Sequence, residues 1–269
     1  MTGALDQDQL DRYARQVVMD DVGPAGQAAL LEGSVLIVGI GGLGSPVVQY
    51  LAAAGVGRLG LVDGDVVERS NLQRQVVHGT EDVGRPKVKS AAEYVRSLNP
   101  DVTVDVHETD LTQDNAAELV AGYDVVVDAT DNFEARFLVN DACTLAETPF
   151  VHGAVYRFEG QVTTVDGSGP CYRCLFPEAP PEGTVPDCAT AGVLGVIPGI
   201  VGTIQATEVI KLLLSVGESL SGRVLHVDAS GMNLESVPVS ARPECPICGS
   251  TAQADSLDGI EYDDSFGIN

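Results

Sequence analysis

The sequence predicts an α/β fold in which a Rossmann-like, mostly parallel sheet carries helices on both faces. Short apolar runs alternate with amphipathic segments of helical length between residues 34 and 146. Such alternation is typical of parallel strands that are buried on both faces. After Pro149 the pattern changes to neighbouring apolar runs, which indicates antiparallel strands. We therefore expect mixed strands in the C-terminal part of the sheet.

The first half of the chain supplies the predicted parallel strands and their helices. Leu10, Tyr13 and Val17 fall on one face of a first helix, and Asp8 is in position to cap it. Pro86 can open a later helix, because a first turn needs no N–H from it. The elements expected after the first helix are, in order, helix 24–31, strand 34–39, helix 45–54, strand 58–62, a helix from residue 86, strands 102–107 and 123–128, and helix 132–146.

The second half is expected to extend the sheet. A stretch rich in Pro and Glu, residues 171–188, predicts a loop. The elements expected around it are strands 151–156 and 160–165, helix 202–214, and a final hairpin of residues 222–228 and 232–239. No internal repeat or clear linker divides the chain. We expect residues 1–250 to form one domain and the polar, acidic residues 251–269 to form a disordered tail.

The acidic composition excludes several classes of protein. The chain has 15 Lys and Arg against 39 Asp and Glu, which gives a net charge of −24, and 44% of its residues are hydrophobic. The hydrophobic content excludes a disordered chain. The charge disfavours a nucleic-acid partner, because the field of the protein would repel phosphates. So few lysines are typical of a protein from a halophilic organism, because high salt in the cytoplasm screens the repulsion between its negative charges.

Two uncharged stretches, residues 34–57 and 189–207, have the hydropathy of membrane spans. The first contains a Gly-rich pattern, and the second contains Pro198, four glycines and Gln205. We therefore expect two buried core segments and no membrane partner. Residues 1–8 lack the apolar segment of a signal peptide, which favours a reducing, cytoplasmic location.

Residues 39–44 read Gly-Ile-Gly-Gly-Leu-Gly between a predicted strand and a predicted helix. Glycines at these positions permit a tight turn and let backbone N–H groups approach a phosphate at the helix N-terminus. Asp63 follows the next strand, where an acid would hold ribose hydroxyls. The pattern predicts an adenine-nucleotide site and does not distinguish NAD from ATP. Its glycines are Gly39, Gly41, Gly42 and Gly44.

Polar residues near the ends of the following strands favour ATP. Cations such as Arg74 and Lys87 suit the charge that builds on a departing pyrophosphate, and Asp131 could hold Mg²⁺ against the phosphates. A hydride-transfer enzyme needs no such set. The polar side chains expected at this edge of the sheet are Asp65, Asn71, Arg74, Gln75, Lys87 and Asp131.

Four of the six cysteines form two Cys-x-x-Cys pairs that lie 70 residues apart in turn-like contexts. Four thiolates suit tetrahedral, structural zinc, and a closed set of four leaves no position for a catalytic water. A redox role is disfavoured, because neither pair is expected to open a helix after a strand. The predicted Zn²⁺ ligands are Cys171, Cys174, Cys245 and Cys248.

Two cysteines and a histidine remain as candidate reactive groups. Cys143 lies on the apolar stripe of helix 132–146 and is expected in the core. His152 lies on a core strand and is expected to be a hydrogen-bonded interior residue. Cys188 follows a stretch without hydrophobic periodicity, so we expect an accessible thiol that could displace AMP from an acyl-adenylate. No neighbouring cation is certain to activate this thiol, so a structural role for Cys188 stays open.

Together these motifs resemble the MoeB/ThiF family, relatives of ubiquitin-activating enzymes that adenylate the C-terminal glycine of ubiquitin-like and sulfur-carrier proteins. The resemblance extends from about residue 8 to residue 250, and the charge suggests a haloarchaeal type. The matching runs are Arg12-Tyr-Ala-Arg15-Gln, Gly39-x-Gly-Gly-x-Gly44, Asp63-x-Asp-x-Val-Glu68-x-Ser-Asn71-Leu-x-Arg74-Gln, Gly84-x-Pro-Lys87, Asp128-Ala-Thr-Asp131-Asn, Cys171-x-x-Cys174, Cys188-x-x-Ala-Gly192-Val-Leu-Gly and Cys245-Pro-x-Cys248.

The resemblance implies a role for each motif. Asp63 should contact the ribose of ATP, and Asp131 should serve Mg²⁺ and catalysis. The first helix should place Arg15 in the site of the partner subunit of a symmetric homodimer. Cys188 matters for thioester formation or sulfur transfer in some members of the family and is dispensable in others. The residues that should contact the phosphates are Asn71, Arg74 and Lys87.

The family implies an ATP-dependent enzyme whose partner is a small β-grasp protein ending in Gly-Gly, with a separate protein as sulfur donor where sulfur is transferred. Protein conjugation, molybdopterin biosynthesis, thiamine synthesis and tRNA thiolation all use this chemistry. Two alternatives stay open. An NAD(P)-dependent oxidoreductase shares the Gly-rich loop and Asp63. A non-catalytic, zinc-stapled scaffold is harder to reconcile with Arg74, Lys87 and Asp131.

Overall fold

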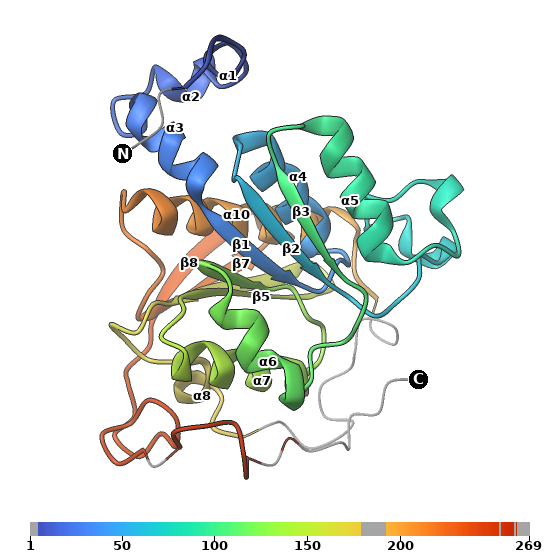
Figure 1. The fold of residues 1–269 in the computed structure, drawn as a ribbon. Coiled ribbons are helices and arrows are strands. Elements are labelled where there is room, and N and C mark those ends of the chain that lie inside the picture. Colours follow the sequence, from blue (N-terminus) through green and yellow to red (C-terminus); the bar gives the residue numbers. More distant parts are fainter. Residues whose placement is uncertain (1–4, 179–191, 253, 261, 263–269) are drawn as a thin grey trace.

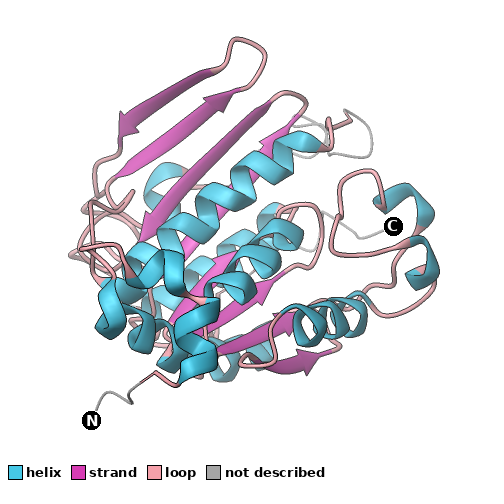
Figure 2. Cartoon of the chain, turned by 90° about the horizontal axis from the view of Figure 1, so that it is seen from above, coloured by secondary structure: helices cyan, strands magenta, loops and turns pink. Residues whose placement is uncertain are grey.

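The computed structural model describes residues 5–178, 192–252, 254–260 and 262. These residues form an eight-stranded sheet in the order β3-β2-β1-β4-β5-β6-β7-β8, with helices on both faces (Figures 1 and 2). The first five strands in this order are mutually parallel, and the last three are antiparallel. The strands are β1 (Ser34–Val38), β2 (Arg58–Val62), β3 (Thr103–His107), β4 (Val125–Asp128), β5 (Phe150–Tyr156), β6 (Glu159–Val165), β7 (Arg223–Asp228) and β8 (Asn233–Pro238). The predicted fold class is confirmed.

Two layers of helices cover the sheet (Figure 1). Helices α3, α4, α5 and α10 bury one face, and α6, α7 and α8 bury the other. The helices are α1 (Gln7–Arg12), α2 (Ala14–Val17), α3 (Gly23–Glu32), α4 (Gly44–Ala54), α5 (Lys87–Leu98), α6 (Gln113–Ala121), α7 (Phe133–Leu145), α8 (Tyr172–Leu175) and α10 (Val196–Leu214), with short 3₁₀ turns η1 (Arg69–Asn71) and η2 (Thr80–Asp82).

The order of the central strands creates a place for a ligand. From β1 the chain passes to β2 on one side, while β4 lies on the other side of β1. In open α/β sheets, ligands bind outside the carboxyl ends of the strands at such a switch point. The Gly-rich loop follows β1, and residues 129–131 follow β4, so both lie at this point.

The first helix is broken where the sequence predicts continuity. Asp6, and not Asp8, caps α1, because its side chain accepts a hydrogen bond from the N–H of Gln9. The helix ends at Tyr13, whose hydroxyl accepts from Asn99 and lies 3.1 Å from a carboxylate oxygen of Asp101. This tertiary anchoring of a buried ring separates α1 from α2.

Three helices differ from the expectation. Helix α6 was not predicted, because only two of its residues, Ala116 and Val120, are buried, which gives almost no periodic signal. Helix α8 lies in the expected loop, and Cys171 is its N-cap. Cys171 thus opens a short helix, but β6 ends at Val165, so this helix does not follow a strand directly, which is the arrangement that the expectation concerned. Helix α10 begins six residues before Gly202, because Pro198 lies in its first turn, where it removes no hydrogen bond.

Helix α10 is long and apolar enough to cross a membrane by length and composition alone. It packs along β4, β5 and β6 and against α3 and α4, and its buried residues include Ile197, Val201 and Val209. These contacts are those of a core helix. The expectation of a buried segment is confirmed for residues 196–207.

The described part of the C-terminal tail packs on the domain. Leu257 is buried in the core cluster of α6 and α7. The carbonyl of Leu257 accepts a hydrogen bond from Gln113, and the Tyr262 hydroxyl donates to Asp141 at 3.0 Å. These contacts join Leu257 and Tyr262 to the domain, while the disorder expected for residues 251–269 as a whole stays a prediction.

Candidate nucleotide site and metal centre

The loop after β1 needs glycine at two positions for steric reasons. Gly39 has a φ of +91°, and a Cβ there would lie 2.7 Å from the carbonyl oxygen of Ala129. A Cβ on Gly44 would lie 2.0 Å from the carbonyl oxygen of Gly39. The loop is therefore a tight turn pressed against the end of β4, with the N-terminus of α4 opening behind it.

Asp63 and Lys87 are brought together beside this loop. One carboxylate oxygen of Asp63 accepts from the N–H of Ile40 at 2.7 Å, and the other from the N–H of Asp65 at 2.9 Å. The Lys87 ammonium lies 2.6 Å from Asp65 and 3.7 Å from Asp63. Burial raises the pKa of the Asp63 carboxyl, although the Lys87 charge and these hydrogen bonds oppose the shift. The nearly buried ammonium of Lys87 thus lies where a phosphate can compete with Asp63 and Asp65 for it.

Arg74 and Gln75 cover the glycines of the loop. A Cβ on Gly42 would lie 3.4 Å from Cγ of Arg74, and one on Gly41 would lie 3.5 Å from the Gln75 amide nitrogen. The Arg74 guanidinium donates only to the carbonyl of Ser70, at 3.3 Å, among the described residues. The buried Gln75 Oε1 has no hydrogen-bond partner in the described part of the chain. These side chains can bind a ligand without breaking a strong internal contact.

Asn71 plays a different local role from the one expected. Its side-chain oxygen accepts from the N–H of Glu68 at 3.0 Å and so shapes the turn η1 that leads to Arg74. Among the described residues, the amide nitrogen of Asn71 donates no hydrogen bond, so it is open to a ligand. Asp131 is exposed after β4, at the same edge of the sheet.

A buried pair that the sequence did not assign to the site lies beneath Asp131. His152 Nδ1 is 2.7 Å from Asp128 Oδ2, and both side chains are almost fully buried. Burial favours the neutral form of Asp128, but the His152 hydrogen bond and the Arg136 charge outweigh it and lower the pKa of the carboxyl. Burial lowers the pKa of His152. The interior histidine is confirmed, and its contact with Asp128 follows from the register of β4 and β5.

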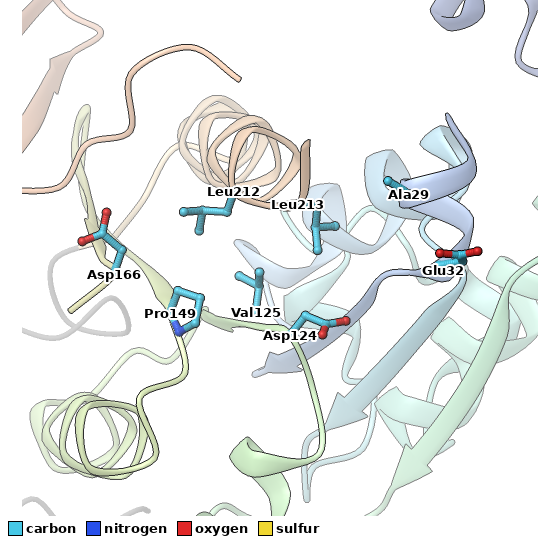
Figure 3. A pocket seen from close by; sticks show the side chains of 8 residues that line it. All are labelled: Ala29, Glu32, Asp124, Val125, Pro149, Asp166, Leu212 and Leu213. Carbon is cyan, nitrogen blue, oxygen red and sulfur yellow. The ribbon is translucent and has the colours of Figure 1, made fainter. Parts of the chain in front are cut away.

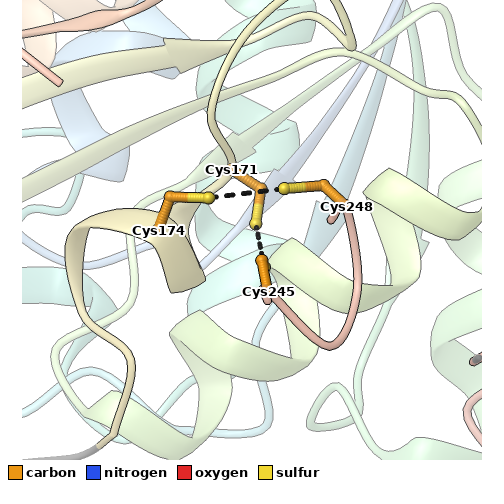
Figure 4. A group of neighbouring side chains, drawn as sticks. All are labelled: Cys171, Cys174, Cys245 and Cys248. Atoms are coloured by element: carbon orange, nitrogen blue, oxygen red, sulfur yellow. Dashed lines mark hydrogen bonds between the residues drawn. The ribbon is translucent and has the colours of Figure 1, made fainter. Parts of the chain in front are cut away.

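The four predicted metal ligands form one cluster (Figure 4). All four sulfurs lie within 4.8 Å of one another. The Sγ atoms of Cys171 and Cys245 are 3.6 Å apart, and those of Cys174 and Cys248 are 3.4 Å apart. A tetrahedral zinc with Zn–S bonds of about 2.3 Å requires sulfur separations of about 3.8 Å. The cluster therefore fits zinc with little movement.

The electrostatics of the cluster also favour a cation. Burial, and then the neighbouring thiols, raise the pKa of Cys171. A divalent cation reverses this effect, because a coordinating thiol is deprotonated. The backbone N–H of Arg242 donates to Cys174 Sγ at 3.3 Å, as a second layer of support for a thiolate. The expected core position of Cys143, which is fully buried, is confirmed.

Arg15 is not brought to this edge. Arg15 is exposed on α2, and the neighbouring Gln16 donates to the carbonyl of Ala54, at the far end of α4 from the Gly-rich loop. A helix of that length separates its ends by roughly 16 Å. Cys188 lies outside the described residues.

A hollow of ≈ 410 Å³ lies at the opposite edge of the sheet (Figure 3). Leu212, Leu213 and Val125 line it, and none of the predicted site residues does. Its Asp124 carboxylate accepts from Ser34, and Asp166 accepts from Ser168 and Ser221. These acids already have internal partners, so the hollow offers no free polar group for chemistry from those two residues.

Comparisons with known proteins agree with this geometry. The ThiF family model matches residues 13–247. The SAMP-activating enzyme E1 of Haloferax volcanii is 60% identical over 269 residues, which cover 100% of this chain and 99% of that protein. The sulfur carrier protein adenylyltransferase of Thermus thermophilus is 49% identical, with 97% and 98% of the two chains covered. The crystal structure of E. coli MccB with ATP has a TM-score of 0.76 at 22% identity, over 92% of this chain and 75% of that one, and so supports the fold.

Proposed function

Since the chain belongs to the ThiF family, we propose that it is an adenylyltransferase that uses ATP to activate the C-terminal glycine of small ubiquitin-like or sulfur-carrier proteins. The observation that carries the proposal is the convergence of the Gly39–Gly44 turn, Arg74 and Lys87 at the switch point of the sheet. The names of two relatives that this chain covers almost completely describe activation of such carriers. No observation favours the oxidoreductase alternative.

The residues at the sheet edge fit adenylation. The carrier carboxylate attacks the α-phosphorus of ATP; an O–P bond forms, the bond to the bridging oxygen of the pyrophosphate breaks, and pyrophosphate leaves. A carboxylate is already ionised, so the reaction depends on positioning and charge neutralisation. Asp63 and Asp65 would contact the ribose side, and Asn71, Arg74 and Lys87 would contact the phosphates. The triphosphate would also accept hydrogen bonds from backbone N–H groups of the turn that contains Gly39, Gly41, Gly42 and Gly44. Asp131 would hold Mg²⁺, which supplies further neutralisation of the pyrophosphate.

The second chemical step is assigned to Cys188. Its thiolate attacks the acyl carbonyl of the adenylate, a C–S bond forms, the C–O bond to AMP breaks, and AMP leaves with its phosphate negatively charged. The thiol proton passes to solvent. The thioester would then serve protein conjugation, or a separate sulfur-donor protein would serve molybdopterin biosynthesis or tRNA thiolation.

A homodimer would complete the site. Arg15 lies too far from the loop of its own chain to reach it, so it would act in the partner subunit. Exposed apolar side chains near it and on α4 support such an interface: Val18, Met19 and Tyr50 have relative exposures of 74%, 51% and 55%. The four-cysteine cluster would hold Zn²⁺ as a structural metal. The net charge of −24 supports a halophilic, cytoplasmic protein.

Carrier-dependent exchange between ATP and labelled pyrophosphate tests the function. Purified protein should incorporate label into ATP only when a β-grasp protein ending in Gly-Gly is present. The same carrier without its last glycine is the matched control and should give no exchange. Exchange absent with every Gly-Gly carrier from the source proteome, together with saturable binding of NADH, would contradict the proposal and favour an oxidoreductase.

A further inference from the structure

A buried polar network lies beneath the proposed nucleotide edge. Asp128 uses both oxygens: Oδ1 accepts from the N–H and the hydroxyl of Thr130 at 3.0 and 2.6 Å, and Oδ2 accepts from His152 Nδ1. The carboxylate therefore fixes the turn that immediately precedes Asp131. His152 holds the carboxylate in turn.

The same network extends to the four-cysteine cluster. The ring of Tyr172 packs on that of His152, with centroids 4.6 Å apart. Tyr172 lies between two of the proposed metal ligands, on α8. Its N–H donates to Oδ1 of Asn140 at 2.7 Å, and the adjacent Arg173 donates from Nε to Oδ1 and from a terminal nitrogen to Oδ2 of Asp141. Helix α8 is thus fastened to α7, with its tyrosine directed onto the histidine.

Packing alone does not account for these residue types. His152 Nε2, the Tyr172 hydroxyl and Arg136 Nε are buried and have no hydrogen-bond partner within the described ranges. Burying an unpaired polar atom costs free energy, so an apolar residue would serve a purely structural core better. Arg136 also donates to the carbonyl of Thr130, at 3.4 Å. The hydrogen bonds that Arg136 and Oδ1 of Asp128 form converge on Thr130, in the turn before Asp131.

We propose that His152 and Tyr172 are positioning residues that hold the Asp128–Thr130 turn and thereby Asp131, so that the four-cysteine cluster and the nucleotide edge are coupled. His152 orients the Asp128 carboxylate through one hydrogen bond, and Tyr172 packs on the imidazole from the side of the four-cysteine cluster. The inference rests on the proposed function for its kinetic consequences. Its structural part, a link between the cluster and His152, can be tested without any turnover.

The kinetic test compares substitutions of one histidine. His152→Phe keeps the ring and removes the hydrogen bond, whereas His152→Asn keeps a donor near the position of Nδ1. Loss of a supporting partner typically weakens a metal site by about 10–100-fold. His152→Phe should raise the half-saturating Mg²⁺ concentration of carrier-dependent exchange at least about tenfold and lower kcat, and His152→Asn should restore most of both.

The matched control is Tyr123→Phe, which removes a hydrogen bond to Asp105 in the same core cluster but away from Asp128. It should leave the Mg²⁺ dependence unchanged. Equal effects of His152→Phe, His152→Asn and Tyr123→Phe would overturn the positioning role, because they would reflect core damage alone.

The second test is spectroscopic. A proton on His152 Nδ1, held 2.7 Å from a buried carboxylate, should give a slowly exchanging downfield NMR resonance that disappears in His152→Phe. Tyr172→Leu, with zinc content verified by metal analysis, should shift this resonance and speed its exchange. An unchanged resonance would overturn the coupling. A shifted resonance in a protein that never catalyses exchange would refute the proposed function and leave the structural link intact.

Discussion

Asp131 and Cys188 are assigned to different bonds, and this separation can be tested one residue at a time. Asp131 lies at the sheet edge with the Gly-rich turn, where the proposed adenylation takes place. The Cys188 thiol is not needed for that step, because attack on the α-phosphate uses no sulfur. Two buried histidines, His78 and His152, also act at the residue scale, because their protonation affects the free energy of unfolding.

Cys188→Ala should retain carrier-dependent ATP–pyrophosphate exchange and lose any thiol-sensitive covalent adduct with the carrier. Asp131→Ala should lose both, by roughly 100-fold or more in exchange rate, because the charge on the leaving pyrophosphate is no longer neutralised. Exchange assays and non-reducing gels measure the two steps. Full downstream activity of Cys188→Ala would show that the adenylate passes directly to an external acceptor and would remove only the covalent step.

The unfolding free energy should fall as the pH is lowered below about 6.5. Burial lowers the pKa of both His78 and His152 from 6.5, so the native chain stays neutral where the unfolded chain binds protons. Stability rises with pH wherever the unfolded state binds more protons, by about 1.4 kcal/mol per pH unit per proton. Urea titrations between pH 7.5 and 5 at constant high salt measure the slope.

Replacing His152 with Asn should make this slope shallower, because one of the two protons is removed. A slope that does not respond to His152→Asn would show that carboxylates, and not this histidine, dominate the pH dependence in that range.

At the scale of elements, a metal in the cysteine cluster would bind α8 to the segment that carries Cys245 and Cys248, in addition to the contact between Arg242 and Cys174. The second pair comes from a segment without regular structure, residues 239–252. Segments of this kind have few backbone hydrogen bonds of their own, so a metal supplies their folding energy.

The purified protein should contain about one zinc per chain, and exhaustive chelation should cost on the order of 10 kcal/mol of local folding energy. Cys171→Ser should lose zinc and expose the loop of residues 239–252 to proteolysis. Cys143→Ala, which removes a buried thiol outside the cluster, should keep its zinc. A metal-free protein with unchanged protease resistance would contradict a structural zinc site.

At the scale of the whole molecule, the position of Arg15 is the reason for proposing a second subunit. The residue is exposed at the far end of α4 from the proposed nucleotide site, and apolar side chains beside it lack cover from the described residues of one chain. The proposed active site shared between subunits would account for both observations.

Mixed dimers test this arrangement. Arg15→Ala and Arg74→Ala chains should each be at least about tenfold less active alone, and mixing them should restore partial exchange, because one of the two sites in the heterodimer is intact. Differently tagged chains, purified through both tags, ensure that heterodimers are measured. If such heterodimers are no more active than the parents, Arg15 does not act across an interface.

The sequence by itself determined the existence of the parallel strands through its buried apolar runs, and it determined the tight Gly-rich turn after β1, in which Gly39 and Gly44 have no room for a Cβ. It also identified the four cysteines, because their spacing is local. These features are encoded by neighbouring residues, and periodicity or spacing is enough to reveal them.

Only the tertiary structure decided the features that depend on residues far apart in the chain. The break at Tyr13 comes from Asn99 and Asp101, the docking of Leu257 from Gln113, and the Asp128–His152 pair from the register of two strands. None of these contacts has a periodic signature, because each joins single side chains across 24 to 144 positions. Packing against a distant partner, and not local propensity, sets their conformation.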